Sequence, residues 1–265
     1  MKCKICNSET KSFFTRKVLK KYDVQYFSCS NCGFIFTENP YWLDEAYESA
    51  ITKVDTGILW RNNLLSKQVS IILFYLFDKN AKFLDYAGGL GIFTRLMRDI
   101  GFDFYWDDLY SKNELSRGFE YDKCLNINAI TSFEAFEHFE NSINEIEKML
   151  EISPNIIFST ELQPKPNPNP DEWWYYLFDT GQHINFYSIK TLQYLAQTYG
   201  LYFYSLGWIH IFSKKKLNKK FFKLRQFLFK INMLDKYENY LFEKIKKEMK
   251  PKYQEDMEYM LLNYD

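Results

Sequence analysis

The chain has 265 residues, of which 46% are hydrophobic and 26% charged, so it can bury a substantial core and is not a disordered chain. Lys plus Arg and Asp plus Glu both number 34, and this balance argues against a surface that neutralises the phosphates of a long nucleic acid. The longest apolar run, residues 71–77, is far shorter than the roughly 20 residues that cross a bilayer.

Four of the five cysteines form two pairs with metal-ligand spacing, Cys3-x2-Cys6 and Cys29-x2-Cys32. Two residues between thiols let both sulfurs point into one site, and two such pairs give the four-thiolate shell that structural Zn²⁺ prefers. No secretory signal is visible at the N-terminus, so we expect a cytoplasmic protein in a reducing compartment, where two disulfides are the weaker alternative. A closed four-Cys shell is structural rather than catalytic.

Residues 1–40 are predicted to form a small zinc-ribbon domain. Apolar residues alternate between the two cysteine pairs, which indicates short strands too few to fold without the metal: Val18, Tyr22, Val24, Tyr26, Phe34 and Phe36. The fifth cysteine, Cys124, is expected to be a buried apolar residue.

After the ribbon, Asp55 to Arg61 precede a helix that continues to Leu73. Arg61 is a candidate for an acidic acceptor group or a cofactor carboxylate, with a surface ion pair as the commoner fate.

Residues 82–100 contain the most informative pattern in the chain. A short apolar strand runs into Gly88, Gly89 and Gly91, and apolar residues then recur at helical spacing up to Gly101. Glycines in such a loop permit positive φ and a close approach of the backbone to a ligand. The dinucleotide fingerprint needs a third Gly or Ala at position 94, which is Thr94, so pyrophosphate binding is disfavoured.

The pattern Asp85-x-Ala87-x-Gly89-x-Gly91 resembles motif I of class I S-adenosylmethionine (SAM) methyltransferases, with Ala87 in place of a glycine. The resemblance implies a Rossmann-like α/β fold over residues 41–213, with SAM held at this loop. It assigns cofactor contacts to Asp85, Tyr86, Ala87, Gly88, Gly89, Gly91 and Phe93.

Residues 102–108 are expected to form the second strand. Matching the end of this strand to the family favours Asp108 as the ribose-binding acid, with Asp107 as the alternative. The rings of Tyr86, Phe93 and Trp106 suit a cationic sulfonium, or else pack the core.

The later elements also follow this family. Residues 127–133 are expected to form a strand, and Phe133 and Glu134 at its end are assigned to the cofactor site by the resemblance of the following Glu-x-x-Glu-His segment. A capping box at Ser142 predicts a helix, residues 155–160 a buried strand, and Ser188 the N-cap of a helix that ends at Gly200. A final hairpin turns at Gly207. The third strand is poorly defined.

Acid–base residues are expected on loops beyond the carboxyl ends of the strands. His183 is favoured as the base because the segment from Gly181 to Ser188 resembles the Gly-x-His segment of small-molecule and sugar methyltransferases. His138 is second, and each histidine has a loop-orienting role as its alternative. Glu161 is predicted to orient the base or contact the acceptor, whereas His210 is structural.

Four prolines, at 164, 166, 168 and 170, predict a stiff segment before an aromatic run. Trp173, Trp174 and Tyr175 then form either a stacking wall for the acceptor or a hydrophobic plug of the core. Residues 214–265 are expected to be an amphipathic helical tail with a basic face, which packs on the catalytic domain or on a second copy, or docks on a membrane surface.

Together these features predict a SAM-dependent methyltransferase with a structural Zn²⁺. The resemblance favours O-methylation of a small polar acceptor in capsule or other surface-glycan biosynthesis, such as a nucleotide-linked sugar or a phosphate- or phosphoramidate-type precursor. C-methylation of a keto-deoxysugar is a close variant. The alternatives are a zinc-ribbon RNA methyltransferase, which the neutral charge disfavours, and a non-catalytic SAM- or zinc-binding module.

Overall fold

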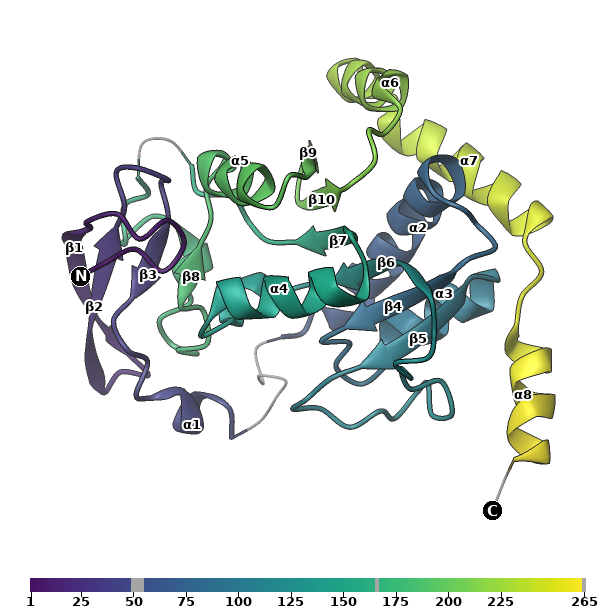
Figure 1. Ribbon diagram of the computed structural model, residues 1–265, viewed down its shortest axis with the longest axis horizontal. Helices are drawn as coiled ribbons and strands as arrows, with labels where there is room; N and C mark the ends of the chain where they lie inside the picture. Colours follow the sequence, from purple (N-terminus) through teal and green to yellow (C-terminus); the bar gives the residue numbers. More distant parts are fainter. Residues whose placement is uncertain (49–54, 165–166, 264–265) are drawn as a thin grey trace. The chain divides into compact units, whose positions relative to one another are not determined.

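The computed structural model describes residues 1–48, 55–164 and 167–263 (Figure 1). The chain divides into two compact units, each made from two stretches of sequence. Unit 1 comprises residues 1–52 and 132–215, and unit 2 comprises residues 53–131 and 216–265. These units do not follow the boundaries expected at residues 40 and 213, because the N-terminal sheet packs with later residues of unit 1 and the tail packs with the helices of unit 2. Pro166 of the proline-rich loop lies outside the described residues.

The N-terminal sheet of unit 1 contains the predicted strands and one that the sequence did not reveal. β1 (Lys11–Val18), β2 (Tyr22–Ser28) and β3 (Ile35–Thr37) pair antiparallel in chain order. The fourth strand, β8 (Asn185–Phe186), pairs with β3, with Ile35 opposite Phe186 and Phe36 opposite Asn185. The segment after His183 is therefore a strand of the ribbon sheet.

A buried aromatic cluster fills the space beside this sheet. Its members come from both stretches of unit 1: Val18, Val24, Tyr26, Ile35, Trp42, Leu43, Ala46, Trp173, Tyr175, Tyr176, Ile184 and Phe186. Tyr176 contacts Phe14 and Tyr26 edge to face, at ring-centroid distances of 5.2 and 6.0 Å, and such pairs add to the stabilisation from burial alone. The plug interpretation therefore holds for Trp173, Tyr175 and Tyr176, whereas Trp174 is 67% exposed.

The rest of unit 1 consists of short helices and an antiparallel set of strands. β7 (Asn155–Ser159) pairs with β10 (Ile209–Ser213), which pairs with β9 (Tyr202–Leu206) across the expected turn at Gly207. The helices are α1 (Leu43–Ala46), α4 (Ser142–Ile152) and α5 (Ile189–Thr198), with 3-10 turns η1 (Phe136–His138) and η2 (Trp174–Tyr176).

The ends of two helices test the capping predictions. Ser188 caps α5 in a capping box with Thr191, as expected. The predicted cap of α4 is wrong by one residue, because the side chain of Asn141 accepts the hydrogen bond from Asn144 N. The Ser142 hydroxyl instead accepts a hydrogen bond from the Tyr187 hydroxyl at 2.8 Å.

The first stretch of unit 2 contains the strand–loop–helix pattern predicted from the glycines. The elements of this stretch are α2 (Ile58–Leu76), β4 (Lys82–Tyr86), α3 (Ile92–Ile100), β5 (Asp103–Asp107) and β6 (Ile127–Ser132), which crosses into unit 1 at its last residue. β4 pairs parallel with both β5 and β6. No strand forms between residues 107 and 127, in keeping with the undefined third strand.

The larger sheet has the strand order β5-β4-β6-β7-β10-β9, with parallel pairing around β4 and antiparallel pairing around β10. This order confirms the expected mixed α/β fold with a central sheet. In such sheets ligands bind beyond the carboxyl ends of the parallel strands. A ligand is therefore expected beside the loops that follow β4 and β5.

The tail is helical, as expected, and contains three helices: α6 (Lys219–Lys230), α7 (Leu234–Glu248) and α8 (Tyr253–Leu262). α7 packs against α2, and the chain between α7 and α8 passes over Gly101, where a Cβ would lie 2.6 Å from Lys250 O. Among the described residues no helix has both the length and the apolar content to span a bilayer.

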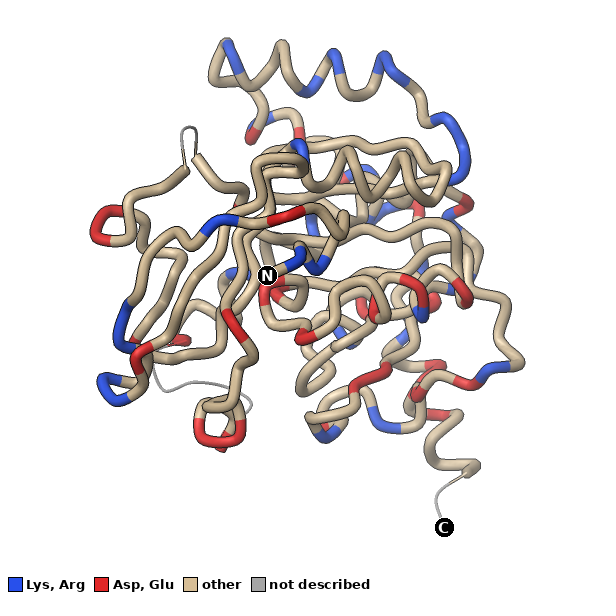
Figure 2. Tube along the Cα trace, turned by 60° about the vertical axis from the view of Figure 1, so that its left-hand side comes forward, with Lys and Arg blue, Asp and Glu red and all other residues tan. Residues whose placement is uncertain are grey.

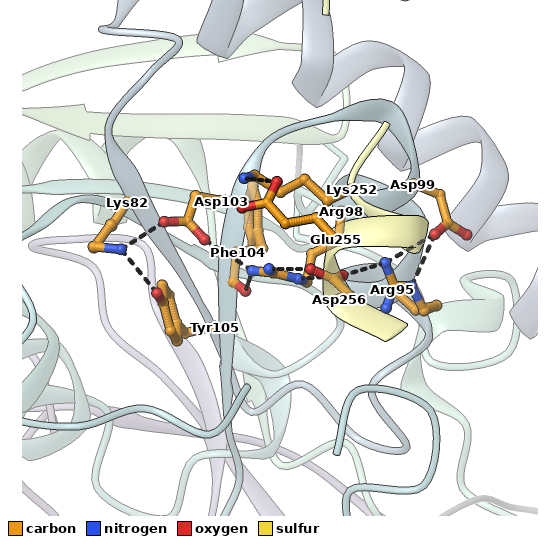
Figure 3. Close-up of polar contacts among 10 residues, drawn as sticks. All are labelled: Lys82, Arg95, Arg98, Asp99, Asp103, Phe104, Tyr105, Lys252, Glu255 and Asp256. Carbon is orange, nitrogen blue, oxygen red and sulfur yellow. Dashed lines mark hydrogen bonds and ion pairs between the residues drawn. The ribbon is translucent and has the colours of Figure 1, made fainter. Parts of the chain in front are cut away.

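α8 is fixed to α3 by an ion-pair network (Figure 3). Arg98, whose side chain is 5% exposed, donates to both oxygens of Asp256 at 2.6 and 2.8 Å and to Asp103 at 2.8 Å. Arg95 donates to Asp256 at 2.7 Å. Burial opposes ionisation of Asp256, but the two guanidinium groups outweigh it and hold its pKa below the usual value.

Replacing Asp256 by Ala should lower the free energy of unfolding by about 3 kcal/mol, because it leaves the buried charge of Arg98 with Asp103 alone. Chemical denaturation followed by circular dichroism measures this loss. The control is Asp99→Ala, which removes an exposed partner of Arg95 and should cost less than about 1 kcal/mol. Equal small losses in the two variants would contradict a structural role for the network.

Candidate functional site

The loop after β4 adopts the left-handed turns that the glycines suggested. Gly89 has φ 55° and Gly91 has φ 81°, and Ala87, which replaces a family glycine, has φ 58°. Gly88 is required for space, since a Cβ there would lie 2.7 Å from Trp106 Cδ1. A Cβ at Gly89 would meet nothing within 4 Å, so the backbone at Gly89 borders open space.

This loop is held by Trp106 of β5 and by Asn113 and Ser116, which follow β5 and were not identified from the sequence. Trp106 Nε1 donates to Gly89 O at 2.9 Å, and Ser116 Oγ donates to Gly91 O at 2.7 Å. Asn113 Oδ1 accepts from Ser116 N at 2.9 Å, which forms a turn next to Gly91. An Asn whose side chain can accept from a backbone N–H further along the chain is a turn signal, and Asn113 could have pointed to this segment.

The two acids at the end of β5 have different surroundings. Asp108 Oδ2 accepts from Gly89 N at 2.9 Å, and its Oδ1 accepts from Tyr110 N and Ser111 N at 2.8 and 2.7 Å. Asp108 therefore ties the two loops together. The half-buried carboxylate of Asp107 makes no hydrogen bond or ion pair with any part of the chain that the structure describes. Burial, followed by the charge of Asp108, raises the pKa of Asp107.

Asp85, at position four of β4, is fully enclosed. Thr94 and Thr131 each donate a hydroxyl hydrogen bond to its carboxylate at 3.1 Å, so it links β4 to α3 and β6. Burial raises the pKa of Asp85 to about 7 despite these two hydrogen bonds. The structure thus places Asp85 beneath the glycine loop as a support for it.

The other residues assigned to the cofactor lie at the strand ends. Tyr86 ends β4 and is 8% exposed, and Phe93 is buried against the edge of Phe104 at a ring-centroid distance of 5.6 Å. Phe133 and Glu134 follow β6 and belong to unit 1. Glu134 has φ 51°, and Ser159 Oγ donates to its carboxylate at 2.7 Å.

A second group of polar side chains lies within unit 1. The ligand-type atoms of Glu137, His138 and His183 all lie within 4.8 Å of one another. Glu137 is completely buried, and its Oε1 is 4.0 Å from His138 Nε2. The rings of His138 and His183 meet edge to face with centroids 4.8 Å apart. The two histidines, 45 positions apart in the sequence, are thus neighbours in the fold.

Backbone carbonyls fix the tautomer of both histidines. His183 Nδ1 lies 2.7 Å from Tyr175 O and His138 Nδ1 lies 3.1 Å from Gln182 O, and a carbonyl can only accept, so each Nδ1 carries the proton. Each Nε2 is left with a lone pair. Burial, followed by the nearby His138, lowers the pKa of His183 well below its usual value, and burial also lowers the pKa of His138. Both imidazoles are therefore neutral proton acceptors near pH 7.

The segment that carries His183 is fixed on both sides. Trp42 Nε1 donates to Gly181 O at 2.8 Å, and Gln182 Nε2 donates to Ala46 O at 2.8 Å. Gly181 has φ 68°, and a Cβ there would lie 2.8 Å from Val18 Cγ1. The N-terminal sheet and α1 therefore determine where His183 lies.

The remaining candidates for the acceptor site have more ordinary surroundings. Glu161 is exposed just after β7, and desolvation followed by the charge of Glu134 raises its pKa. Arg61 forms a bidentate ion pair with Asp55, at 2.8 Å to each oxygen, which is the structural alternative expected for it. Of the three predicted aromatic residues, only Trp174 presents its ring to solvent.

The four paired cysteines come together as predicted. Cys3 and Cys32 have sulfurs 3.6 Å apart, Cys6 and Cys29 have sulfurs 3.5 Å apart, and all four sulfurs lie within 4.8 Å of one another. A tetrahedral Zn–S bond of about 2.3 Å corresponds to a sulfur separation of about 3.8 Å, so this donor set fits the ion. Ile5 N donates to Cys3 Sγ at 3.4 Å, as expected for a thiolate turn.

The cysteine cluster is joined directly to the start of α5. Cys32 O accepts hydrogen bonds from Ser188 Oγ at 3.3 Å and Thr191 Oγ1 at 2.9 Å. Gly33 leaves room for this contact, because a Cβ there would lie 2.5 Å from Ser188 Oγ. The N-cap of α5 and the second cysteine pair therefore stabilise one another.

Two smaller predictions have clear outcomes. The expectation that Cys124 is buried is wrong, because the residue is exposed on the loop before β6. His210 is structural, as expected: it is completely buried, with Nδ1 3.1 Å from Ser205 Oγ and Nε2 3.1 Å from Thr160 O.

Comparison with known proteins identifies the family. Residues 60–206, more than half of the chain, match the model of a methyltransferase domain family. The chain belongs to this methyltransferase family. The matched range runs from α2 to β9 and includes both the glycine loop and His183. The protein is therefore a methyltransferase.

Similar solved structures are distant. Magnesium protoporphyrin IX methyltransferase from Synechocystis PCC 6803 with bound SAH has 12% identity and a TM-score of 0.43, over 64% of this chain and 90% of that chain. An O-methyltransferase family 2 protein from Planctomyces limnophilus in complex with apigenin has 13% identity and a TM-score of 0.43, over 63% of each chain. Human N-acetylserotonin methyltransferase with SAM has 13% identity and a TM-score of 0.42, over 60% and 53%. No curated protein sequence matches the chain.

Proposed function

We propose that this methyltransferase O-methylates a small polar acceptor during the biosynthesis of a surface glycan. The observation that carries the proposal is the pair of neutral imidazoles beside Glu137, each with Nδ1 fixed by a backbone carbonyl. A hydroxyl acceptor must lose a proton during methyl transfer, and a neutral imidazole suits that role near pH 7. The acceptor class itself rests on the resemblance of the Gly181–Ser188 segment to sugar methyltransferases.

SAM supplies an activated methyl group on a sulfonium. Two features of unit 2 suit SAM. The backbone at Gly89 borders open space, and an acid lies at the end of β5. Asp107, rather than the initially favoured Asp108, is the acid for the ribose hydroxyls, since the Asp108 carboxylate is already occupied by three backbone N–H groups. Asp85 supports the loop from below.

His183 Nε2 is the proposed proton acceptor. It is held by Tyr175 O, and the segment that carries it is bound to the N-terminal sheet. His138 is a positioning residue, because it packs on the His183 ring and has Glu137 beside its Nε2. Glu161 and Trp174, both exposed, are available to an acceptor.

The four cysteines are proposed to hold a structural Zn²⁺. Their sulfurs fit a tetrahedral shell, and four protein ligands leave no open position for chemistry. The ion acts on the enzyme through structure, because it fixes β3 and the N-cap of α5, between which the His183 segment runs.

The assignment of the ribose acid predicts different outcomes for two adjacent substitutions. Asp107→Ala should weaken SAM binding by about 1.5 to 3 kcal/mol, or about ten- to a hundredfold, with little change in stability, because it removes charged hydrogen bonds to the ligand. Asp108→Ala should lower the free energy of unfolding by about 1 to 2 kcal/mol, because Gly89 N, Tyr110 N and Ser111 N lose their acceptor. Calorimetry with SAM and its demethylated product, together with denaturation curves, measures both effects. Unchanged SAM affinity in Asp107→Ala would contradict the assignment.

The role of His183 and the acceptor class are tested together with labelled SAM. Purified enzyme should methylate members of a panel of nucleotide sugars and phosphorylated metabolites, and not RNA. His183→Gln should lower kcat by at least about a hundredfold without changing SAM affinity, since a general base contributes on that scale. His138→Gln should have a smaller effect. Methylation of RNA, or full activity in His183→Gln, would overturn the proposal.

Zinc content provides the test of the cysteine cluster. Plasma mass spectrometry should find one equivalent of zinc per chain, and Cys32→Ser should lose it together with thermal stability, because the ribbon depends on the ion. Cys124→Ser is the matched control, since this exposed thiol lies outside the cluster. A zinc-free wild-type protein of unchanged stability would contradict the assignment.

A further inference from the structure

The helix α6 and the residues on either side of it form a surface of one charge. This α6 surface, residues 216–233, contains five lysines and Arg225 and no Asp or Glu, although the whole chain has a net charge of zero. Figure 2 shows the helix with Lys and Arg alone along its length. The cationic character is thus local to this helix.

One side of α6 is anchored to the rest of unit 2. Arg225 forms a buried ion pair with Glu238 of α7. Phe221, Leu224 and Arg225 line a small pocket together with residues of α2 and α7, although Leu224 is also 43% exposed. This contact fixes the orientation of α6, and therefore which of its residues face the solvent.

The exposed side carries an apolar strip. Leu224, Phe227 and Ile231 are 43%, 58% and 48% exposed, and their spacing of three and four residues places them on one face. Lys220 and Lys223 lie four residues before Leu224 and Phe227, so they lie beside this strip. Large apolar side chains in water next to cations are the pattern of a helix that rests in a bilayer interface.

The lysines of this surface are free to meet a partner. Within the described part of the chain, Lys216, Lys219, Lys220, Lys223 and Lys230 form no ion pair. A partner of the α6 surface must therefore have an apolar region that receives the strip and negative charges that meet the lysines. In a twofold dimer through this surface, both patches would carry the same positive charge and would repel one another.

We propose that the α6 surface docks on an anionic lipid bilayer. The strip of Leu224, Phe227 and Ile231 enters the boundary between headgroups and acyl chains, and the lysines face the phosphates of the headgroups. The enzyme is then a peripheral membrane protein that methylates its acceptor at the bilayer surface. This inference does not depend on the acceptor class.

Co-sedimentation of the full-length, zinc-loaded protein with phosphatidylcholine vesicles, with and without phosphatidylglycerol, tests the proposal. Binding is expected only with phosphatidylglycerol and should weaken at high NaCl, because screening reduces the attraction. Phe227→Glu should weaken binding about tenfold or more, since it puts a charge into the apolar strip. Tyr240→Glu, at a 65% exposed residue of the acid-containing helix α7, is the matched control and should bind as the wild type does.

A second variant keeps the test decisive if Phe227→Glu misfolds. The double substitution Lys220→Glu and Lys223→Glu should also weaken vesicle binding about tenfold or more while SAM affinity, measured by calorimetry, is unchanged. Three outcomes overturn the proposal. These are no binding to phosphatidylglycerol vesicles, equal binding to both vesicle types, and a wild-type dimer in light scattering that Phe227→Glu converts to a monomer.

Discussion

The position of the candidate base depends on one shared core. The aromatic cluster of unit 1 combines side chains of β1, β2, β3 and α1 with those of η2 and β8, so the N-terminal sheet and the segment around His183 bury one another. Each part covers apolar side chains of the other, so the burial that stabilises one part also stabilises the other. The N-terminal sheet therefore packs on the segment to which we assign the proposed base.

The same dependence links the cysteine cluster to catalysis. The second cysteine pair precedes β3 and accepts hydrogen bonds from the N-cap of α5, and the His183 segment runs between these two anchors. If the cysteines bind the proposed metal, its removal should disturb the His183 segment through these contacts. In unit 2, a comparable arrangement holds the glycine loop, where Trp106, Asp108 and Ser116 tie it to the chain after β5.

Local patterns were sufficient to predict much of this architecture. The cysteine spacing, the glycines after β4, the N-cap at Ser188 and the turn at Gly207 are short-range signals, and each was found where expected. The cap of α4 moved from Ser142 to Asn141, because the Ser142 hydroxyl bonds to Tyr187, a residue 45 positions away. Burial was harder to predict, as the exposed Cys124 and the buried Trp173 and Tyr175 demonstrate.

The sequence by itself determined the strand–glycine–helix unit, the thiolate donor set and the methyltransferase family, because each depends on residues close together in the chain. Only the tertiary structure decided that β8 completes the ribbon sheet, that Glu137, His138 and His183 form one group, and that Asp108 is occupied by backbone N–H groups while Asp107 is not. It also decided which side of α6 is buried. These outcomes follow from contacts between distant segments, whose pairing depends on packing and solvent exclusion rather than on local propensity.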